Sequence, residues 1–207
     1  MVKHIKKVTK RRPTRERKRI IVVGAEGNNK SEIQYFHELE KKQNKYHFIL
    51  APGKATDPER IVRKTANKAK QENLDYNHGD LALSVFDLDN DLAKVSQLEA
   101  AKELAQKKRV TIVTSNPCFE VWYLEHFGYT SKPLLNSDEV IKELRKSLPE
   151  YMKNHCDFDV LYPSTEAAIK NCEKIILFHE SNGASDEFAN PRTDVHKIVR
   201  VLMESTE

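Results

Sequence analysis

Acidic side chains gather behind one of the strands that the sequence predicts. Asp87 and Asp89 follow the apolar run 81–86 and are separated by one residue. In extended backbone both side chains project to the same side, and carboxylates this close repel each other unless a cation lies between them. Such oxygen ligands suit Mg²⁺ or Mn²⁺ and not zinc. The pair predicts a divalent-metal site; the alternative is a turn in which Asp89 or Asp91 caps the next helix.

Glu26 and Glu120 are two further acids at predicted strand ends. Glu26 lies in segment 24–27 (GAEG), where flanking glycines let the backbone turn tightly and admit a phosphate. A carboxylate there can complete a metal shell or act as general acid or base; the alternative is an ordinary turn residue. Glu120 follows the strand end at 114–117. It either joins the metal site or is a first-turn acid favoured by the helix dipole.

Four other side chains have reactive or phosphate-binding groups, but structural roles explain them as well: Cys118, His126, His196 and Arg192. Cys118 has no base beside it in the sequence to activate a nucleophile. For the two histidines we prefer a structural role to orienting a phosphate or a metal. Arg192 precedes Thr193 and Asp194, either of which can cap a helix, and a phosphate contact is the alternative.

The elements that must position these residues alternate between strand and helix. Apolar runs predict strands at 20–24, 46–50, 81–86 and 109–114. Helical spacing predicts helices at 31–43, 58–73, 92–107, 119–127, 137–148, 164–181 and 193–203. We expect Ser31, Asp57 and Asp91 to cap three of them. In the helix at 119–127, Trp122, Leu124 and Phe127 are expected to pack in the core rather than stack on bases.

This alternation predicts an α/β fold. We expect a parallel sheet of about four strands flanked by helices, with a helical C-terminal part. The corresponding division is a basic arm at 1–18, an α/β core at 19–127 and a helical region packed on that core at 128–207. Ligands of open parallel sheets bind beyond the carboxyl ends of the strands, which is where the acids above are placed.

The charge of the chain is divided unevenly. Residues 1–19 hold ten Lys and Arg against Glu16 alone, whereas the remainder holds 25 basic and 30 acidic residues, so the two parts carry +9 and −5. A basic arm on an acidic body is typical of proteins that meet nucleic acid. The alternative is a solvated tail without a partner. The arm residues expected to bind phosphates are Lys10, Arg11, Arg12, Arg15, Arg17, Lys18 and Arg19.

Composition excludes several classes of protein. The 207 residues suit one domain or one domain with a small annex, and three widely spaced cysteines exclude a disulfide framework and a cysteine zinc site. No apolar run is long enough for a membrane span or fits a signal peptide. We therefore expect a cytoplasmic protein without membrane contact. A phosphotransferase or primase-like enzyme ranks last, because no phosphate-binding glycine motif is present.

Four blocks of sequence carry a family resemblance: 17–36 (RKRIIVVGAEGNNKSEIQYF), 85–89 (VFDLD), 115–127 (SNPCFEVWYLEHF) and 190–196 (NPRTDVH). The glutamate loop after one strand and the Asp-x-Asp after a later strand resemble the Toprim fold, and the four blocks together resemble the RloB family. The chain departs from that family at Ala25, where a cysteine is common. By this resemblance, Glu26 matches the Toprim glutamate and Asp87 and Asp89 match its metal-binding aspartates.

The resemblance implies a Toprim-type, Mg²⁺-dependent nuclease in antiviral defence and abortive infection, acting with an AAA- or ABC-type ATPase partner. We expect Asp87 and Asp89, with Glu26 and Glu120, to hold Mg²⁺ or Mn²⁺ while Glu26 moves a proton. The substrate is nucleic acid, either DNA or tRNA or another RNA, held by the basic arm. The alternative function is a catalytically silent, metal-binding adaptor subunit of a defence ATPase.

Overall fold

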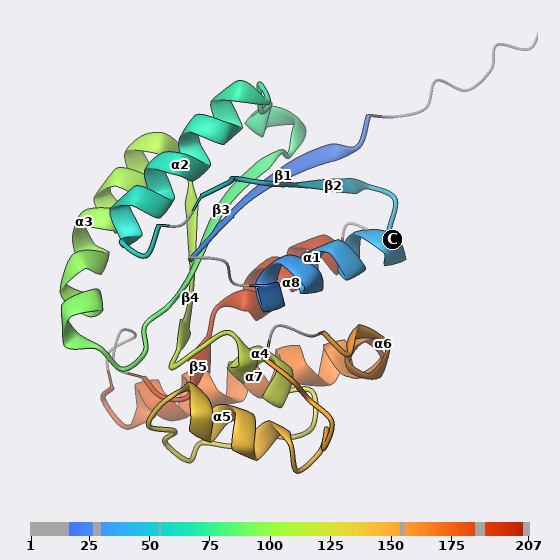
Figure 1. Ribbon diagram of the computed structural model, residues 1–207, viewed down its shortest axis with the longest axis vertical. Coiled ribbons are helices and arrows are strands. Elements are labelled where there is room, and N and C mark those ends of the chain that lie inside the picture. The colour runs from blue at the N-terminus through green and yellow to red at the C-terminus, as the bar shows by residue number, and fades with distance from the viewer. Residues whose placement is uncertain (1–16, 27–29, 54, 154–155, 185–188, 205–207) are drawn as a thin grey trace, which may run out of the picture.

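The computed structural model describes residues 17–26, 30–53, 55–153, 156–184 and 189–204, and within these ranges the chain builds one five-stranded sheet (Figure 1). The strands are β1 (Arg19–Ala25), β2 (Tyr46–Leu50), β3 (Leu81–Asp87), β4 (Thr111–Asn116) and β5 (Arg192–Thr193). Their order is β2-β1-β3-β4-β5, and only β5 runs antiparallel to its neighbour. The predicted α/β class and parallel sheet are confirmed.

Strand β5 is the one strand that the sequence did not predict. It has two residues, which pair with Ser115 and Asn116 of β4. So short a strand has no alternation of apolar and polar positions to reveal it. Strand β4 also begins later than expected, at Thr111, because the preceding helix continues to Lys108 and Arg109 ends it in the left-handed conformation, with φ of 58°.

The helices of the described ranges are α1 (Lys30–Lys42), α2 (Pro58–Gln71), α3 (Leu92–Lys108), α4 (Glu120–Leu124), α5 (Ser137–Leu144), α6 (Phe158–Leu161), α7 (Thr165–Ser181) and α8 (Val195–Glu204). Seven of these helices in the described ranges lie at predicted positions, although α4 and α5 end earlier than expected, and α6 was not predicted. Two short 3₁₀ turns lie at Tyr76–His78 and Tyr162–Ser164. None of the helices in the described part of the chain combines the length and hydropathy that crossing a bilayer requires.

Two of the three predicted caps are confirmed. Asp57 accepts a hydrogen bond from the backbone N–H of Arg60, and Asp91 accepts one from Ala93. The expected cap at Ser31 is wrong, because α1 begins one residue earlier and the Ser31 hydroxyl instead donates to Glu120.

The sheet separates two layers of helices, with α2 and α3 on one face and α1 and α8 on the other (Figure 1). Successive strand residues point to opposite faces. Val22 therefore packs with Val62 of α2, whereas Val23 belongs to the cluster that includes Tyr35 of α1 and Trp122 of α4.

The helical C-terminal part shares the larger of these cores with the sheet. Its Phe158 lies 5.3 Å from Tyr35, measured between ring centroids, and Val195 and Val199 of α8 are fully buried in the same cluster. Trp122 and Leu124 are buried as expected. The expectation that Phe127 packs in the core is wrong, because its exposed fraction is 36%.

Candidate functional site

The carboxyl ends of β1 and β3 bring the predicted acids to one edge of the sheet. The two strands are neighbours, with Ala25 opposite Val85, so Glu26 and Asp87 leave the sheet side by side. The ammonium group of Lys94, in the first turn of α3, joins this cluster. Its Nζ donates to both carboxylate oxygens of Glu26 at 2.9 and 3.0 Å, to Oδ2 of Asp89 at 2.6 Å and to the backbone oxygen of Asp87 at 3.2 Å.

The loop after β3 holds Asp89 in a defined position. Asp89 and Asn90 both have positive φ angles, of 53° and 54°, a conformation that Asp and Asn tolerate better than most residues. The backbone N–H of Asn90 donates to Oδ1 of Asn116 at 3.0 Å, and that of Asp89 donates to the oxygen of Pro117. The neighbouring strand end therefore shapes the acidic loop, and Asp91 closes it by capping α3.

Glu32 of α1 and Glu120 of α4 approach the carboxyl end of β3. Glu120 is 3% exposed, and its Oε1 accepts hydrogen bonds from the Ser31 hydroxyl at 3.0 Å and the Tyr151 hydroxyl at 3.1 Å. Glu32 is 1% exposed. The structure thus gathers Glu26, Asp87, Asp89 and Glu120, as expected from the sequence, and adds Glu32.

Asp87 experiences the field of the whole cluster. Burial, followed by the charges of Glu32 and Glu120 and then of Asp89 and Glu26, raises the pKa of Asp87 well above its ordinary value. Its Oδ1 is buried and has no hydrogen-bond partner among the described residues. A buried acceptor without a partner is costly, and a bound cation is one way in which such a cost is relieved.

Lys94 carries the positive charge that faces these acids. Burial disfavours its charged form, but the hydrogen bonds to Asp89 and Glu26 outweigh this and raise the pKa of Lys94 above its ordinary value. The all-oxygen donor set and the unpartnered Oδ1 of Asp87 fit Mg²⁺ or Mn²⁺. With Lys94 between Glu26 and Asp89, however, no three acidic, His or Cys side chains of the described ranges are placed to hold an ion.

The glycine before Glu26 has a packing role that the sequence did not reveal. A Cβ atom on Gly24 would lie 2.0 Å from the Oγ1 of Thr65 in α2. Gly24 therefore lets α2 approach β1 closely. Gly27 lies outside the described residues. The expectation that Gly24 helps to form a tight turn for a phosphate is therefore wrong. Gly24 lies within β1, and its lack of a side chain allows the close packing of helix and strand.

Cys118, His126 and His196 occupy buried positions. Burial raises the pKa of the Cys118 thiol well above its usual value, so the thiolate that a nucleophile requires is suppressed. Burial lowers the pKa of His126 to about 4, and its Nδ1 lies 2.8 Å from the oxygen of Trp122. His196 is also buried, with Nδ1 2.9 Å from the oxygen of Thr193. These placements favour the structural role preferred for the histidines.

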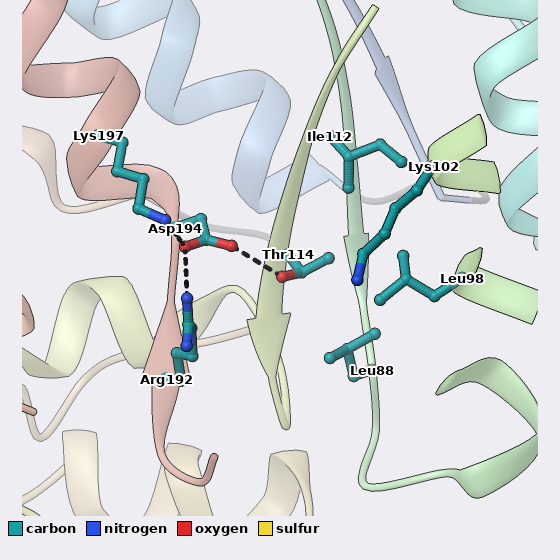
Figure 2. A pocket seen from close by; sticks show the side chains of 8 residues that line it. All are labelled: Leu88, Leu98, Lys102, Ile112, Thr114, Arg192, Asp194 and Lys197. Atoms are coloured by element: carbon teal, nitrogen blue, oxygen red, sulfur yellow. Dashed lines mark hydrogen bonds and ion pairs between the residues drawn. The ribbon is translucent and has the colours of Figure 1, made fainter. Parts of the chain in front are cut away.

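Arg192 lines a pocket of about 150 Å³ at the β4–β5 edge, shown in Figure 2. Its guanidinium lies 3.4 Å from Asp194, which also accepts hydrogen bonds from Thr114 at 3.0 Å and contacts Lys197 at 2.7 Å. Burial works against the charge of Asp194, but Lys197 and Arg192 hold its pKa below the usual value. The charge of Arg192 is thus balanced within the protein, and a phosphate contact stays a prediction.

The root of the basic arm lies at the opposite edge of the sheet from the acids. Lys10, Arg11, Arg12 and Arg15 are outside the described residues. Arg17 donates to the buried Asp80 at 2.8 Å, and the guanidinium of Arg19 lies 5.8 Å from the ring centroid of Tyr46. Lys18 lies between them, immediately before β1. The arm therefore joins the body at the amino end of β1, and the acids follow its carboxyl end.

Lys94 and Glu32 are the two members of the cluster that sequence reasoning missed. Glu32 carried a usable signal, which is a charged residue on the apolar stripe of a helix, whereas the sequence of α3 has no apolar stripe that would mark Lys94. Glu32 precedes the buried pair Tyr35 and Phe36 by three and four residues, and Lys94 precedes the buried Leu98 by four. No comparable pattern marks Tyr151, which reaches Glu120 from a loop.

A protein-family model described as RloB-like protein matches residues 21–202 of this chain. The matched region contains β1 from Ile21 onward, the other four strands and the whole acidic cluster. Comparison with curated proteins and with solved structures found no match.

Proposed function

This chain belongs to the RloB-like family, and from that premise we propose that it is a metal-dependent nuclease of the Toprim type that hydrolyses phosphodiester bonds in nucleic acid. The observation that carries the proposal is the cluster of four carboxylates around Asp87, whose buried Oδ1 has no hydrogen-bond partner among the described residues. Folded proteins rarely gather like charges in this way without a cation to offset them. The acids lie beyond the carboxyl ends of parallel strands, where such folds bind their ligands.

Asp87, Asp89 and Glu26 are the residues that would hold Mg²⁺ or Mn²⁺, with Glu120 as a further ligand. The ion, when bound, supplies charge that polarises a phosphate and lowers the pKa of a water molecule. The other residues of the site orient these acids. Lys94 holds Glu26 and Asp89 together through its ammonium group.

Glu26 and Glu120 have different parts in this proposal. Glu26 has a side chain that is 14% exposed, so it is accessible to a water molecule, and it would accept that molecule's proton as general base. Glu120 is fixed by the hydroxyl groups of Ser31 and Tyr151 and would act as a fixed charge.

The substrate in this proposal is nucleic acid, either DNA or RNA such as tRNA. The division of charge supports it, because a body at −5 needs the +9 of the N-terminal part to attract phosphates. By family resemblance, the context is antiviral defence with an AAA- or ABC-type ATPase as partner.

A second candidate function is a catalytically silent adaptor of a defence ATPase. The observation that favours it is Lys94, whose Nζ occupies the space between Glu26 and Asp89 as a tethered cation. In this reading the acids bind a metal, but Lys94 keeps Glu26 from acting as a general base and the protein does not cut nucleic acid. The two functions differ in whether a divalent cation makes the protein cut nucleic acid.

The test is cleavage of plasmid DNA and of total tRNA by the purified chain with Mg²⁺, with Mn²⁺ or with EDTA. Glu26→Gln and Asp87→Asn should abolish metal-dependent cutting while leaving the protein folded by circular dichroism. Asp159→Asn is the matched control, since this acid is 88% exposed and pairs with Lys42 on the surface. Cutting that survives in Glu26→Gln would overturn the assignment. Metal binding without cutting by the wild type would favour the adaptor.

A further inference from the structure

A basic groove lies at the amino edge of the sheet, on the opposite side of the molecule from the acids. Its volume is about 440 Å³, and it runs between the C-terminal ends of α2 and α3. Among its described lining residues, four are cationic and none is acidic; the cations are Lys70, Lys107, Lys108 and Arg109. All four are exposed to solvent.

Helix geometry explains only part of this charge. Lysines in the last turn of a helix offset the negative end of its dipole, which accounts for Lys70 in α2 and for Lys107 and Lys108 in α3. Arg109 lies beyond the end of α3, and its guanidinium carbon is 4.3 Å from the ring centroid of Tyr76. This contact holds the guanidinium over an aromatic ring, and both residues line the groove.

The same loop that carries Tyr76 anchors the root of the basic arm. Asp80 accepts hydrogen bonds from Arg17 at 2.8 Å, from the backbone N–H of Ile20 at 2.7 Å and from that of Asp75 at 2.8 Å. The side chain of Arg19 packs against Gly79 of this loop. The arm root, residues 17–19, thus contacts the loop at 75–80, and the same loop contacts Arg109 at the groove.

We propose that this groove and the arm root form one binding surface for the phosphodiester backbone of nucleic acid. Lysine ammonium groups meet phosphates as point charges, and an arginine held over a tyrosine ring can still donate from its guanidinium nitrogens to a phosphate. The inference rests on the nucleic-acid part of the proposed function and names where the body of the protein holds the strand.

The position of the groove sets a length for the substrate. Strand β3 runs from this edge to the acids over seven residues, which at about 3.3 Å per residue is roughly 20 Å. One strand of a duplex places a phosphate about every 3.4 Å along its axis. A nucleic acid that contacts both edges must therefore span about six base pairs, and shorter fragments would lose the contribution of the groove.

The test measures binding without cleavage. The protein is titrated in EDTA into two fluorescent probes, a DNA duplex of about 30 base pairs and an RNA hairpin of equal length. Fluorescence anisotropy gives the association constant K at several salt concentrations, and log K is plotted against log salt concentration. The variant is Lys107→Gln with Lys108→Gln. The matched control is Lys170→Gln with Lys174→Gln, two exposed lysines of α7 that change the net charge equally.

On duplex DNA, each lost cation contact should reduce the salt slope by about 0.9. The groove variant should therefore lose about 1.8 in slope and bind at least about tenfold more weakly at moderate salt, while the control binds as the wild type does. If the groove variant loses affinity for only one of the two probes, the groove binds that type of nucleic acid. Equal slopes and affinities for the groove variant and the control would overturn the proposal, as would a wild type that binds neither probe.

The result is separable from the fate of the nuclease proposal. The binding assay contains EDTA, so its outcome does not depend on whether the wild type cuts when a metal is present. A groove variant that loses binding in EDTA supports the groove even in a protein that never cuts. Normal binding by the groove variant, together with metal-dependent cutting by the wild type, would reject the groove and keep the nuclease.

Discussion

Replacing Lys94 by Gln should destabilise the metal-free protein, because this lysine provides the positive charge between Glu26 and Asp89. The side chains of Lys94 and Glu26 are 19% and 14% exposed, so solvent screens their contact weakly, whereas Asp89 is 47% exposed. Glutamine retains much of the length of the side chain but removes the charge. The acids around Asp87 then have no compensating cation from this helix.

The expected loss can be worked from the contact distances. At 2.6 to 2.9 Å and an effective dielectric constant of about 20, each pair contributes about 6 kcal/mol of Coulomb attraction. Desolvation of the charges offsets much of this, and removing one partner of a buried pair typically costs about 3 to 5 kcal/mol. Because Asp89 is half exposed, we expect the free energy of unfolding to fall by about 2 to 3 kcal/mol.

The assay is urea unfolding followed by circular dichroism, in EDTA and again in millimolar Mg²⁺. If Mg²⁺ binds the acids, it should restore most of the loss, since a ligand at about a hundred times its Kd contributes about 2.7 kcal/mol. Lys146→Gln is the matched control. Lys146 contacts Glu143 at 2.6 Å but is 65% exposed, so its loss should stay within about 0.5 kcal/mol. A Lys94→Gln protein as stable as this control in EDTA would refute the reasoning.

Three further predictions concern the surroundings of the site. Gly24→Ala places a Cβ 2.0 Å from Thr65 and should lower the free energy of unfolding by about 1 to 3 kcal/mol in urea titrations. A loss below about 0.5 kcal/mol would exclude the steric cause. Asp87→Asn removes an acid whose pKa is raised by burial and like charges. The folded wild type holds this proton more tightly than the unfolded chain does, so the stability of the wild type falls as pH rises above the ordinary pKa of an aspartate. At neutral pH the Asp87→Asn protein should therefore unfold at a higher Tm than the wild type. A lower Tm would contradict the argument from like charges. Burial raises the pKa of Glu125 from 4.5 to about 8, so the free energy of unfolding should fall as pH rises from about 4.5 to about 8. Glu125→Gln should remove about 3 to 5 kcal/mol of this pH-dependent change. An unchanged dependence of stability on pH in the variant would exclude Glu125 as the cause.

Much of the fold could be predicted because strong local signals coincide with its elements. Asp57 followed by Pro58 marked the start of α2, and the β-branched and apolar runs marked β1 and β3 to within a residue or two. What could not be predicted depended on tertiary partners. Strand β5 pairs with Ser115 and Asn116 at the sheet edge, and its own two residues are too few to show the alternation that predicts a strand.

The sequence predicted most of the acids of the candidate site but not the residues that surround them. Asp87, Asp89, Glu26 and Glu120 were identified from residue type and from their place at strand ends, and the structure brings them together. Lys94 was missed because a lysine early in a long helix is usually solvated. Only the burial of Leu98, one turn later, shows that this face of α3 lies against the sheet.

The most direct test of the central claim is binding of Mn²⁺, which substitutes for Mg²⁺ and is detected by electron paramagnetic resonance. We predict that the wild-type chain binds Mn²⁺ saturably, that Asp87→Asn loses this binding, and that the surface variant Asp159→Asn retains it. Wild-type protein that leaves Mn²⁺ free in solution, or an Asp87→Asn variant that binds as the wild type does, would contradict the assignment of these acids to a divalent-metal site.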